Sequence, residues 1–190
     1  MKLSEHKDLK AEILALLPKE KDKLLLRLIA KDKVLTEHLH FLLLEDESDL
    51  EERTEVIKEQ ILTLAAHFET LKYRNAKDVL THLRQNTKTI NYFYKVTKAN
   101  FEELSLKIFL LNNTPITFNV QVRTTTKDYE FLFGNYFIKS TLAVLKKFDK
   151  LHEDLQFDLK ADLNKLLTKI YQGNMAVIAQ HLDLPQQIGR

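Results

Sequence analysis

The chain has 190 residues, of which 44% are hydrophobic and 29% charged, and its formal net charge is +2 at pH 7. This composition is typical of a folded soluble protein, and the length favours one domain with a substantial core. The absence of cysteine excludes disulfides and thiolate chemistry, and the low content of Gly (3) and Pro (3) argues against turn-rich all-β and α/β classes.

The apolar runs are too short for a transmembrane helix, which needs about 20 residues. Residues Met1–Asp8 are charged and lack the apolar stretch of a signal peptide. The sequence therefore predicts a cytoplasmic protein with no membrane partner.

The first 45 residues are rich in leucine. Before Pro18, which should end the first helix, one helical face carries apolar residues that we expect to be buried: Leu9, Ile13, Leu16 and Leu17. Residues 19–45 continue with the same spacing of three and four at Leu25, Leu28, Leu35, Leu39 and Leu42. Asp32 occupies the position between Leu28 and Leu35. Because a buried lone carboxylate is costly, either the helix bends and Asp32 caps a new one, or Asp32 lies at an exposed rim.

Residues 49–73 form three clean heptads, with apolar or small residues at Leu50, Thr54, Ile57, Ile61, Leu64, Phe68 and Leu71. Arg74–Asn75 is a short link to the next helical stretch. Links of two to five residues join antiparallel helices. We therefore expect residues 49–73 and 78–112 to form a central hairpin.

The stretch Asp78–Asn112 carries the most regular pattern of the chain. Ten residues alternate in steps of three and four, which places them on one stripe of a helix: Leu80, Leu83, Thr87, Ile90, Tyr94, Thr97, Phe101, Leu104, Ile108 and Leu111. A continuous helix here would be roughly 50 Å long. However, Thr97 occupies a core position, and Asn100 with Glu103 has the spacing of a capping box.

Two architectures are compatible with these patterns. Breaks at both Asp32 and Asn100 would give short paired helices in a HEAT/ARM-like α-solenoid, and no breaks would give a bundle of long helices. Because no self-similarity recurs at a period near 40, we predict an all-α antiparallel bundle of about six to eight helices. It forms a single domain over residues 1–190, with 185–190 as a loose tail.

Residues 115–123 carry the only non-helical signal. Apolar residues alternate there with polar ones at period two: Ile116, Phe118, Val120 and Val122. This predicts one extended strand with unpaired backbone groups, which pairs across a two-fold axis, accepts a partner's strand or packs on the bundle. Helices then follow at Tyr129–His152, at 155–172 with Leu155 to Ile170 on one face, and at Met175–Leu182.

The known catalytic and ligand motifs do not fit this chain. Glu37 and His40 have the Glu-x-x-His spacing of di-iron bundles, but such a site needs two of these motifs and two further glutamates. There is no Gly-x-Ser-x-Gly turn and no glycine-rich phosphate loop. We therefore predict no metal, no cofactor and no enzymatic activity, although residues from distant helices could still converge on an active site.

Charge is segregated along the chain. Residues 45–59 are strongly acidic, whereas 72–98 are basic. Five bases follow helical spacing beside the apolar stripe and form a basic edge: Lys77, Arg84, Lys88, Lys95 and Lys98. A shorter row comprises Lys139, Lys146 and Lys150. Such rows are usually solvated or face acids on a neighbouring helix.

The functional prediction is a non-enzymatic helical interaction or scaffold protein with an unknown protein partner. The strand at 115–123 is a candidate contact for a homodimer or a partner. The alternative is a nucleic-acid-associated protein that uses the basic edge Lys77–Lys98, although a net charge of +2 is weak support for it.

Overall fold

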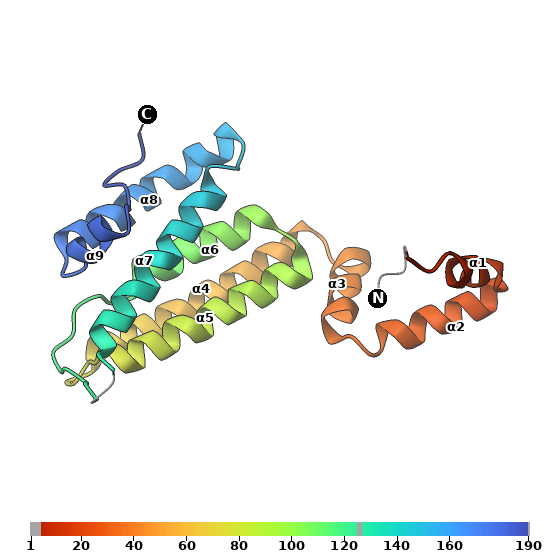
Figure 1. Ribbon diagram of the computed structural model, residues 1–190, viewed down its shortest axis with the longest axis horizontal. Helices are drawn as coiled ribbons and strands as arrows, with labels where there is room; N and C mark the ends of the chain where they lie inside the picture. The colour runs from red at the N-terminus through yellow and green to blue at the C-terminus, as the bar shows by residue number, and fades with distance from the viewer. Residues whose placement is uncertain (1–4, 125–126, 190) are drawn as a thin grey trace. The chain divides into compact units, whose positions relative to one another are not determined.

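The computed structural model describes residues 5–124 and 127–189 (Figure 1). Over these residues the chain forms nine α-helices and no regular β-strand. The helices are α1 (Lys7–Ala15), α2 (Pro18–Ile29), α3 (Lys33–Leu44), α4 (Glu47–Thr70), α5 (Ala76–Thr97), α6 (Asn100–Asn113), α7 (Tyr129–Phe148), α8 (Glu153–Gln172) and α9 (Ala176–His181). The predicted all-α class is confirmed.

The described chain divides into two compact units, with the boundary between Glu45 and Asp46. The first unit contains α1–α3 and the second contains α4–α9. The single domain expected over residues 1–190 stays a prediction.

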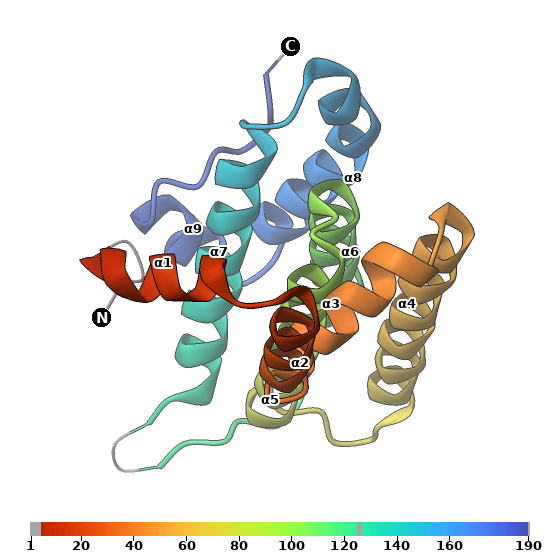
Figure 2. The same ribbon diagram turned by 90° about the vertical axis from the view of Figure 1, so that its right-hand side faces the viewer.

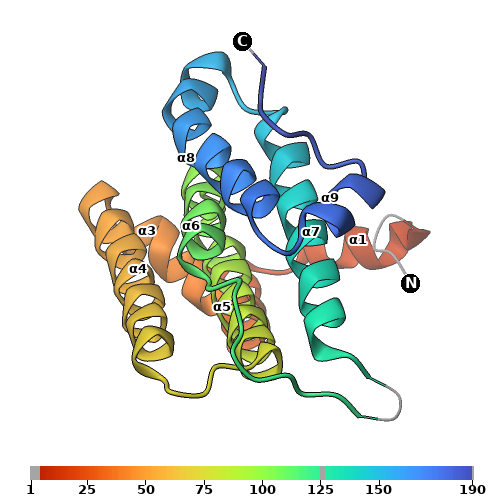
Figure 3. The same ribbon diagram turned by 90° about the vertical axis from the view of Figure 1, so that its left-hand side faces the viewer.

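The second unit is a packed helical bundle. Along the chain α4 contacts α6 and α6 contacts α8, while α5 contacts α7 and α7 contacts α9. Figures 2 and 3 show α5 and α6 between α4 and α7. One hydrophobic cluster joins buried residues from all six helices, from Ile57 in α4 to Ala179 in α9. This shared core confirms the bundle.

The predicted apolar stripe lies in this core. Seven of its residues are buried, and Thr87, Tyr94 and Phe101 are half-buried. The stretch is divided into two helices, which decides the alternative that the sequence left open, because the chain turns at Lys98, whose φ is 58°. The Thr97 hydroxyl accepts a hydrogen bond from the Ala99 N–H at 3.2 Å and donates to the Phe93 carbonyl at 3.0 Å. A threonine side chain that hydrogen-bonds to the backbone competes with the hydrogen bonds of the helix, and so favours termination of the helix at this point.

The chain also breaks at Asp32, whose carboxylate accepts a hydrogen bond from the Leu35 N–H at 3.1 Å and caps α3. Both breaks that the sequence associated with an α-solenoid are therefore present, although α4–α9 share one core. The capping box expected at Asn100 and Glu103 is wrong. Ala99 is the N-cap of α6, and no side chain caps the helix there.

Residues 115–124 connect α6 to α7 without helical structure, as expected. The alternation is confirmed, since the four apolar residues are half-buried and the polar ones between them are exposed. The expected strand is replaced by two isolated bridges, Asn75–Val120 and Arg123–Asp128. The Arg74 carbonyl accepts hydrogen bonds from the Asn119 and Val120 N–H groups at 3.1 and 3.3 Å. Packing on the α4–α5 link therefore satisfies backbone groups that a free strand would leave unpaired.

The segment expected to be a loose tail has one defined contact. The Ile188 N–H donates a hydrogen bond to the Asn164 side-chain oxygen at 2.9 Å, and the Ile188 side chain packs against the core. Arg190 lies outside the described residues.

Candidate functional site

The basic edge of α5 lies beside tyrosines of α7. The Lys77 ammonium is 5.7 Å from the centre of the Tyr129 ring, and the Arg84 guanidinium is 5.1 Å from that of Tyr136. The two bases are seven residues apart on α5, and the two tyrosines are seven residues apart on α7. The two helices are therefore aligned along this contact. Cation–π contacts at exposed sites contribute about 0.5–1 kcal/mol each. Two predicted binding residues therefore also stabilise the α5–α7 packing.

The remaining predicted bases are exposed as well. Lys88 and Lys95 extend the row along α5, and the Lys98 ammonium lies 6.0 Å from the Tyr94 ring. The shorter row on α7 is also exposed: Lys139, Lys146 and Lys150. The two rows therefore lie on neighbouring helices, since α5 contacts α7. We call these eight residues the basic face.

The acidic residues of α4 do not supply the partners of this face in the contacts described. Glu47, Glu51 and Glu55 line a groove of about 350 Å³ together with Glu102 of α6. The Glu55 carboxylate instead accepts a hydrogen bond from the Lys58 ammonium at 2.6 Å.

The structure also places a buried carboxylate between two lysines, which sequence reasoning missed. Glu103 of α6 is only 1% exposed. Its Oε1 accepts a hydrogen bond from Lys107 Nζ at 2.6 Å, and its Oε2 accepts one from Lys147 Nζ at 2.5 Å. Lys147 belongs to α7, and its ammonium also lies 4.9 Å from the Tyr94 ring. The i, i+4 spacing of Glu103 and Lys107 was the available signal, but nothing in the sequence pairs either residue with Lys147.

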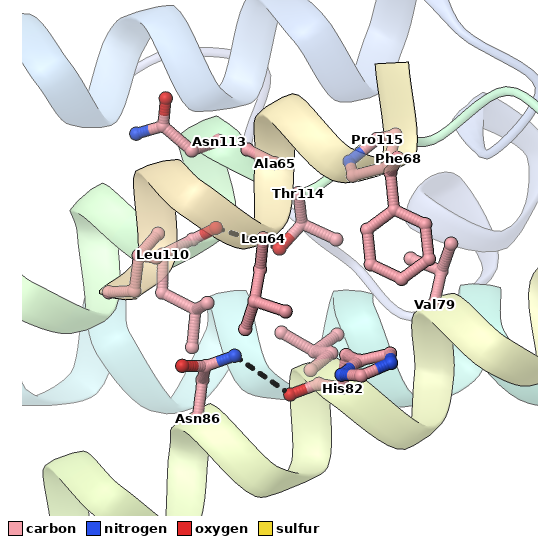
Figure 4. Close-up of a pocket in the computed structure, with 12 residues that line it drawn as sticks. Leu64, Ala65, Phe68, Val79, His82, Asn86, Leu110, Asn113, Thr114 and Pro115 are labelled. Carbon is pink, nitrogen blue, oxygen red and sulfur yellow. Dashed lines mark hydrogen bonds between the residues drawn. The ribbon is translucent and has the colours of Figure 1, made fainter. Parts of the chain in front are cut away.

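A cavity of about 110 Å³ adjoins this ionic cluster, between α5, α6 and α7. Leu110, Leu111 and Val144 supply apolar walls, and Lys107 and Lys147 supply the charged part of the lining. Within the part of the chain that the structure describes, we take this cavity as the candidate ligand site. A second pocket, shown in Figure 4, lies between α4, α5 and α6 but has a volume of only about 20 Å³. That space suits little more than one water molecule.

Lys169 of α8 is a half-buried cation. Its ammonium donates hydrogen bonds to the carbonyls of Leu111, Asn112 and Thr114 at 3.2, 2.7 and 2.6 Å. These carbonyls end α6, where the helix dipole favours a positive charge. Burial, and secondly repulsion from Lys165, lowers the pKa of Lys169 to about 8. This arrangement anchors α8 on the carboxyl end of α6.

We expect Lys169 to make stability depend on pH in the alkaline range. Between about pH 8 and 10.5 the folded protein has released the Lys169 proton, whereas the unfolded chain keeps it. The unfolded state therefore binds more protons there, so the free energy of unfolding should rise with pH across this window. Urea denaturation of the wild type and Lys169→Met checks this. A stability difference between the two proteins that does not change with pH would contradict it.

The residues of the predicted strand contact lie partly inside the bundle. Ile116 and Phe118 pack against the core, and the Phe118 ring meets Phe133 edge-on with 5.0 Å between ring centres. Arg74 binds the same segment, since its Nε donates to the Thr117 carbonyl at 2.7 Å. Val120 and Val122 are half-buried. A role of these four residues in a dimer or partner contact stays a prediction.

Glu37 and His40, which have the spacing of a di-iron motif, each contact a nearby charged residue. His40 Nδ1 lies 2.8 Å from the Glu45 carboxylate, and Glu37 lies 3.6 Å from the Lys33 ammonium. Within residues 5–124 and 127–189, no group of three or more potential ligands could hold a metal ion.

The first unit exposes many leucines. No residue of α1, α2 or α3 is buried, which contradicts the buried face expected at Leu9, Ile13, Leu16 and Leu17. Leu25 and Leu28 of α2 are 57% and 54% exposed. Further leucines of this unit are also exposed: Leu9, Leu14, Leu17, Leu24, Leu26, Leu35, Leu42, Leu43 and Leu44. We call five leucines of α2 and α3 the leucine surface, of which Leu39 is half-buried and the others are exposed: Leu25, Leu28, Leu35, Leu39 and Leu42.

None of the described helices is both long and apolar enough to span a lipid bilayer. Comparison with known proteins yields no matching family, no matching curated protein and no matching solved structure.

Proposed function

We propose that this chain is a non-enzymatic helical interaction protein, and that the leucine surface of α2 and α3 binds a second copy of the chain. The observation that carries this proposal is that α1–α3 have no buried residue, while their leucines, except the half-buried Leu39, are exposed. Exposed apolar residues concentrated in one region mark protein interaction sites.

The lengths of these helices support the same conclusion. α1 has 9 residues, and α2 and α3 have 12 each. Isolated helices shorter than about 12–15 residues are marginal in water, and most helical stability in proteins comes from packing of an apolar face. Full burial of one leucine side chain contributes about 1.5–3 kcal/mol. Contact with another protein surface would therefore stabilise the helices as well as hold the partner.

A second copy fits this surface by spacing and by charge. Leu25 and Leu28 are three residues apart on α2, and Leu35, Leu39 and Leu42 continue in steps of four and three on α3. Such spacing suits the side-by-side packing of helices. Acidic and basic residues nearly balance over residues 1–45, so two copies would not strongly repel each other.

Light scattering coupled to size exclusion tests this proposal. We expect the wild type at about 100 µM to have twice the chain mass of 22.3 kDa. Leu25→Glu with Leu28→Glu should weaken association by about 100-fold or more, because each glutamate would bury an unpaired charge. The control is Lys19→Glu with Lys23→Glu, which places the same residue type at exposed polar positions of α2. A monomeric wild type, or a double leucine variant that associates normally, would contradict the proposal.

The basic face supports nucleic-acid binding as a second candidate function. The specific observation is that α7, which contacts α5, carries the exposed lysines Lys139, Lys146 and Lys150, and that two tyrosines of α7 lie beside bases of α5. Clustered bases neutralise phosphates, and aromatic rings can stack on unpaired bases.

For this second candidate we expect Arg84→Glu, Lys88→Glu and Lys95→Glu together to reduce retention on heparin and to weaken binding of a single-stranded RNA by about tenfold or more at low salt. The matched control reverses three exposed lysines of the first unit, Lys10, Lys19 and Lys23. Retention and RNA binding that are unchanged in the first variant would rule out the basic face as the site.

A further inference from the structure

The cavity beside Glu103 combines an apolar interior with an unbalanced charge. Lys107 and Lys147 both donate to the single carboxylate of Glu103, one to each oxygen. Two ammonium groups and one carboxylate leave a formal charge of +1 at the cavity wall. An ammonium group has three N–H donors, and each lysine uses one of them on Glu103. The site can therefore donate further hydrogen bonds to an anion.

The neutral polar groups of the lining do not offer comparable donors. The Thr87 hydroxyl donates to the Leu83 carbonyl at 2.7 Å, and the Ser140 hydroxyl donates to the Tyr136 carbonyl at 2.8 Å. Both hydroxyl protons are thus directed into their own helices. Hydrogen bonds from a charged donor to a charged acceptor are roughly twice as strong as neutral ones, so the lysines favour an anionic acceptor.

The rest of the lining is hydrocarbon. Leu110, Leu111 and Val144 are buried residues of the bundle core, and Ala143 lies at the exposed rim. An engineered apolar cavity of about 150 Å³ can hold benzene. The cavity of about 110 Å³ therefore suits a chain of a few carbons whose polar end stays beside the lysines.

We propose that this cavity is a binding site for a short-chain aliphatic monocarboxylate. The carboxylate accepts hydrogen bonds from Lys107 and Lys147 and completes the charge balance with Glu103. The alkyl chain lies against Leu110, Leu111 and Val144. This site is separate from the leucine surface, so the proposal does not depend on self-association.

Titration of the full-length protein with hexanoate, followed by amide chemical shifts, tests the proposal. We expect saturable shifts for residues around Leu110 and Val144, with a Kd on the order of 1 mM. Acetate lacks the chain, and hexan-1-ol and hexylammonium lack the carboxylate, so each should bind at least about tenfold more weakly. Equal binding of hexylammonium and hexanoate would overturn the assignment of the lysines.

Three variants, one of them a control, locate the site. Ala143→Phe should fill the rim and abolish the shifts, whereas Ala161→Phe, at an exposed position of α8 outside the cavity lining, should leave them unchanged. Lys147→Met should weaken hexanoate binding by about tenfold while the variant keeps its helical circular dichroism. No saturable shift in the wild type, or wild-type affinity in Ala143→Phe, would overturn the proposal.

Discussion

Replacing Phe137 with alanine should lower the free energy of unfolding by about 4 kcal/mol. Phe137 of α7 is fully buried, and its ring centre lies 5.5 Å from that of Phe133. Truncation removes the transfer free energy of the ring and leaves a cavity that the surrounding helices can only partly close. Urea denaturation followed by circular dichroism measures the change.

Phe157 supplies a control of the same residue type, because it is 80% exposed on α8. Phe157→Ala should change the free energy of unfolding by less than about 0.5 kcal/mol. Similar losses for the two variants would show that α7 does not pack as the core of the bundle.

The second large effect should come from Glu103. Glu103→Met removes the carboxylate that both Lys107 and Lys147 contact, and we expect it to lower the free energy of unfolding by about 2–3 kcal/mol. The expected loss is below that for a fully buried pair, because the Lys147 side chain is 44% exposed and its ammonium can regain water. Lys107, at 20% exposed, has less access to water. The same denaturation measurement gives the value.

A triple variant separates the charges from the packing. With Glu103, Lys107 and Lys147 all changed to Met, no buried charge is left unpaired, so most of the lost stability should return. Glu102→Met is the neighbouring control and should have a small effect. A triple variant that is less stable than Glu103→Met would show that the ionic cluster itself stabilises the bundle.

The stripe from Leu80 to Leu111 shows what local pattern can predict. Seven of its ten residues are buried in α5 and α6, but other buried residues of these helices, such as Phe93 and Leu106, lie outside the stripe. The spacing left the break at Lys98 undecided, because a turn that keeps the same face toward the core leaves the pattern of apolar residues unchanged. At the break the Thr97 hydroxyl contacts Phe93 and Ala99, and these contacts cannot be derived from the position of a threonine in the pattern.

The candidate sites show the complementary limit. The basic edge was visible because its five residues are neighbours on one helix surface. The Glu103 cluster was not, because Lys147 is 44 residues further along the chain. Lys147 reaches Glu103 only when α7 packs beside α6. The leucine pattern of residues 9–42 was interpreted as a buried face, since spacing reports that a face is apolar but not which surface covers it.

The amino-acid sequence by itself determined that this chain is helical, where its apolar faces lie and where its charges separate. These properties follow from residue spacing along one helix, which is a local quantity. Only the tertiary structure decided that α5 and α6 are separate helices, that Arg74 holds the 115–124 connection, and that one buried glutamate is shared by lysines of two helices. Those features depend on side chains from distant parts of the chain meeting in space, which no local period encodes.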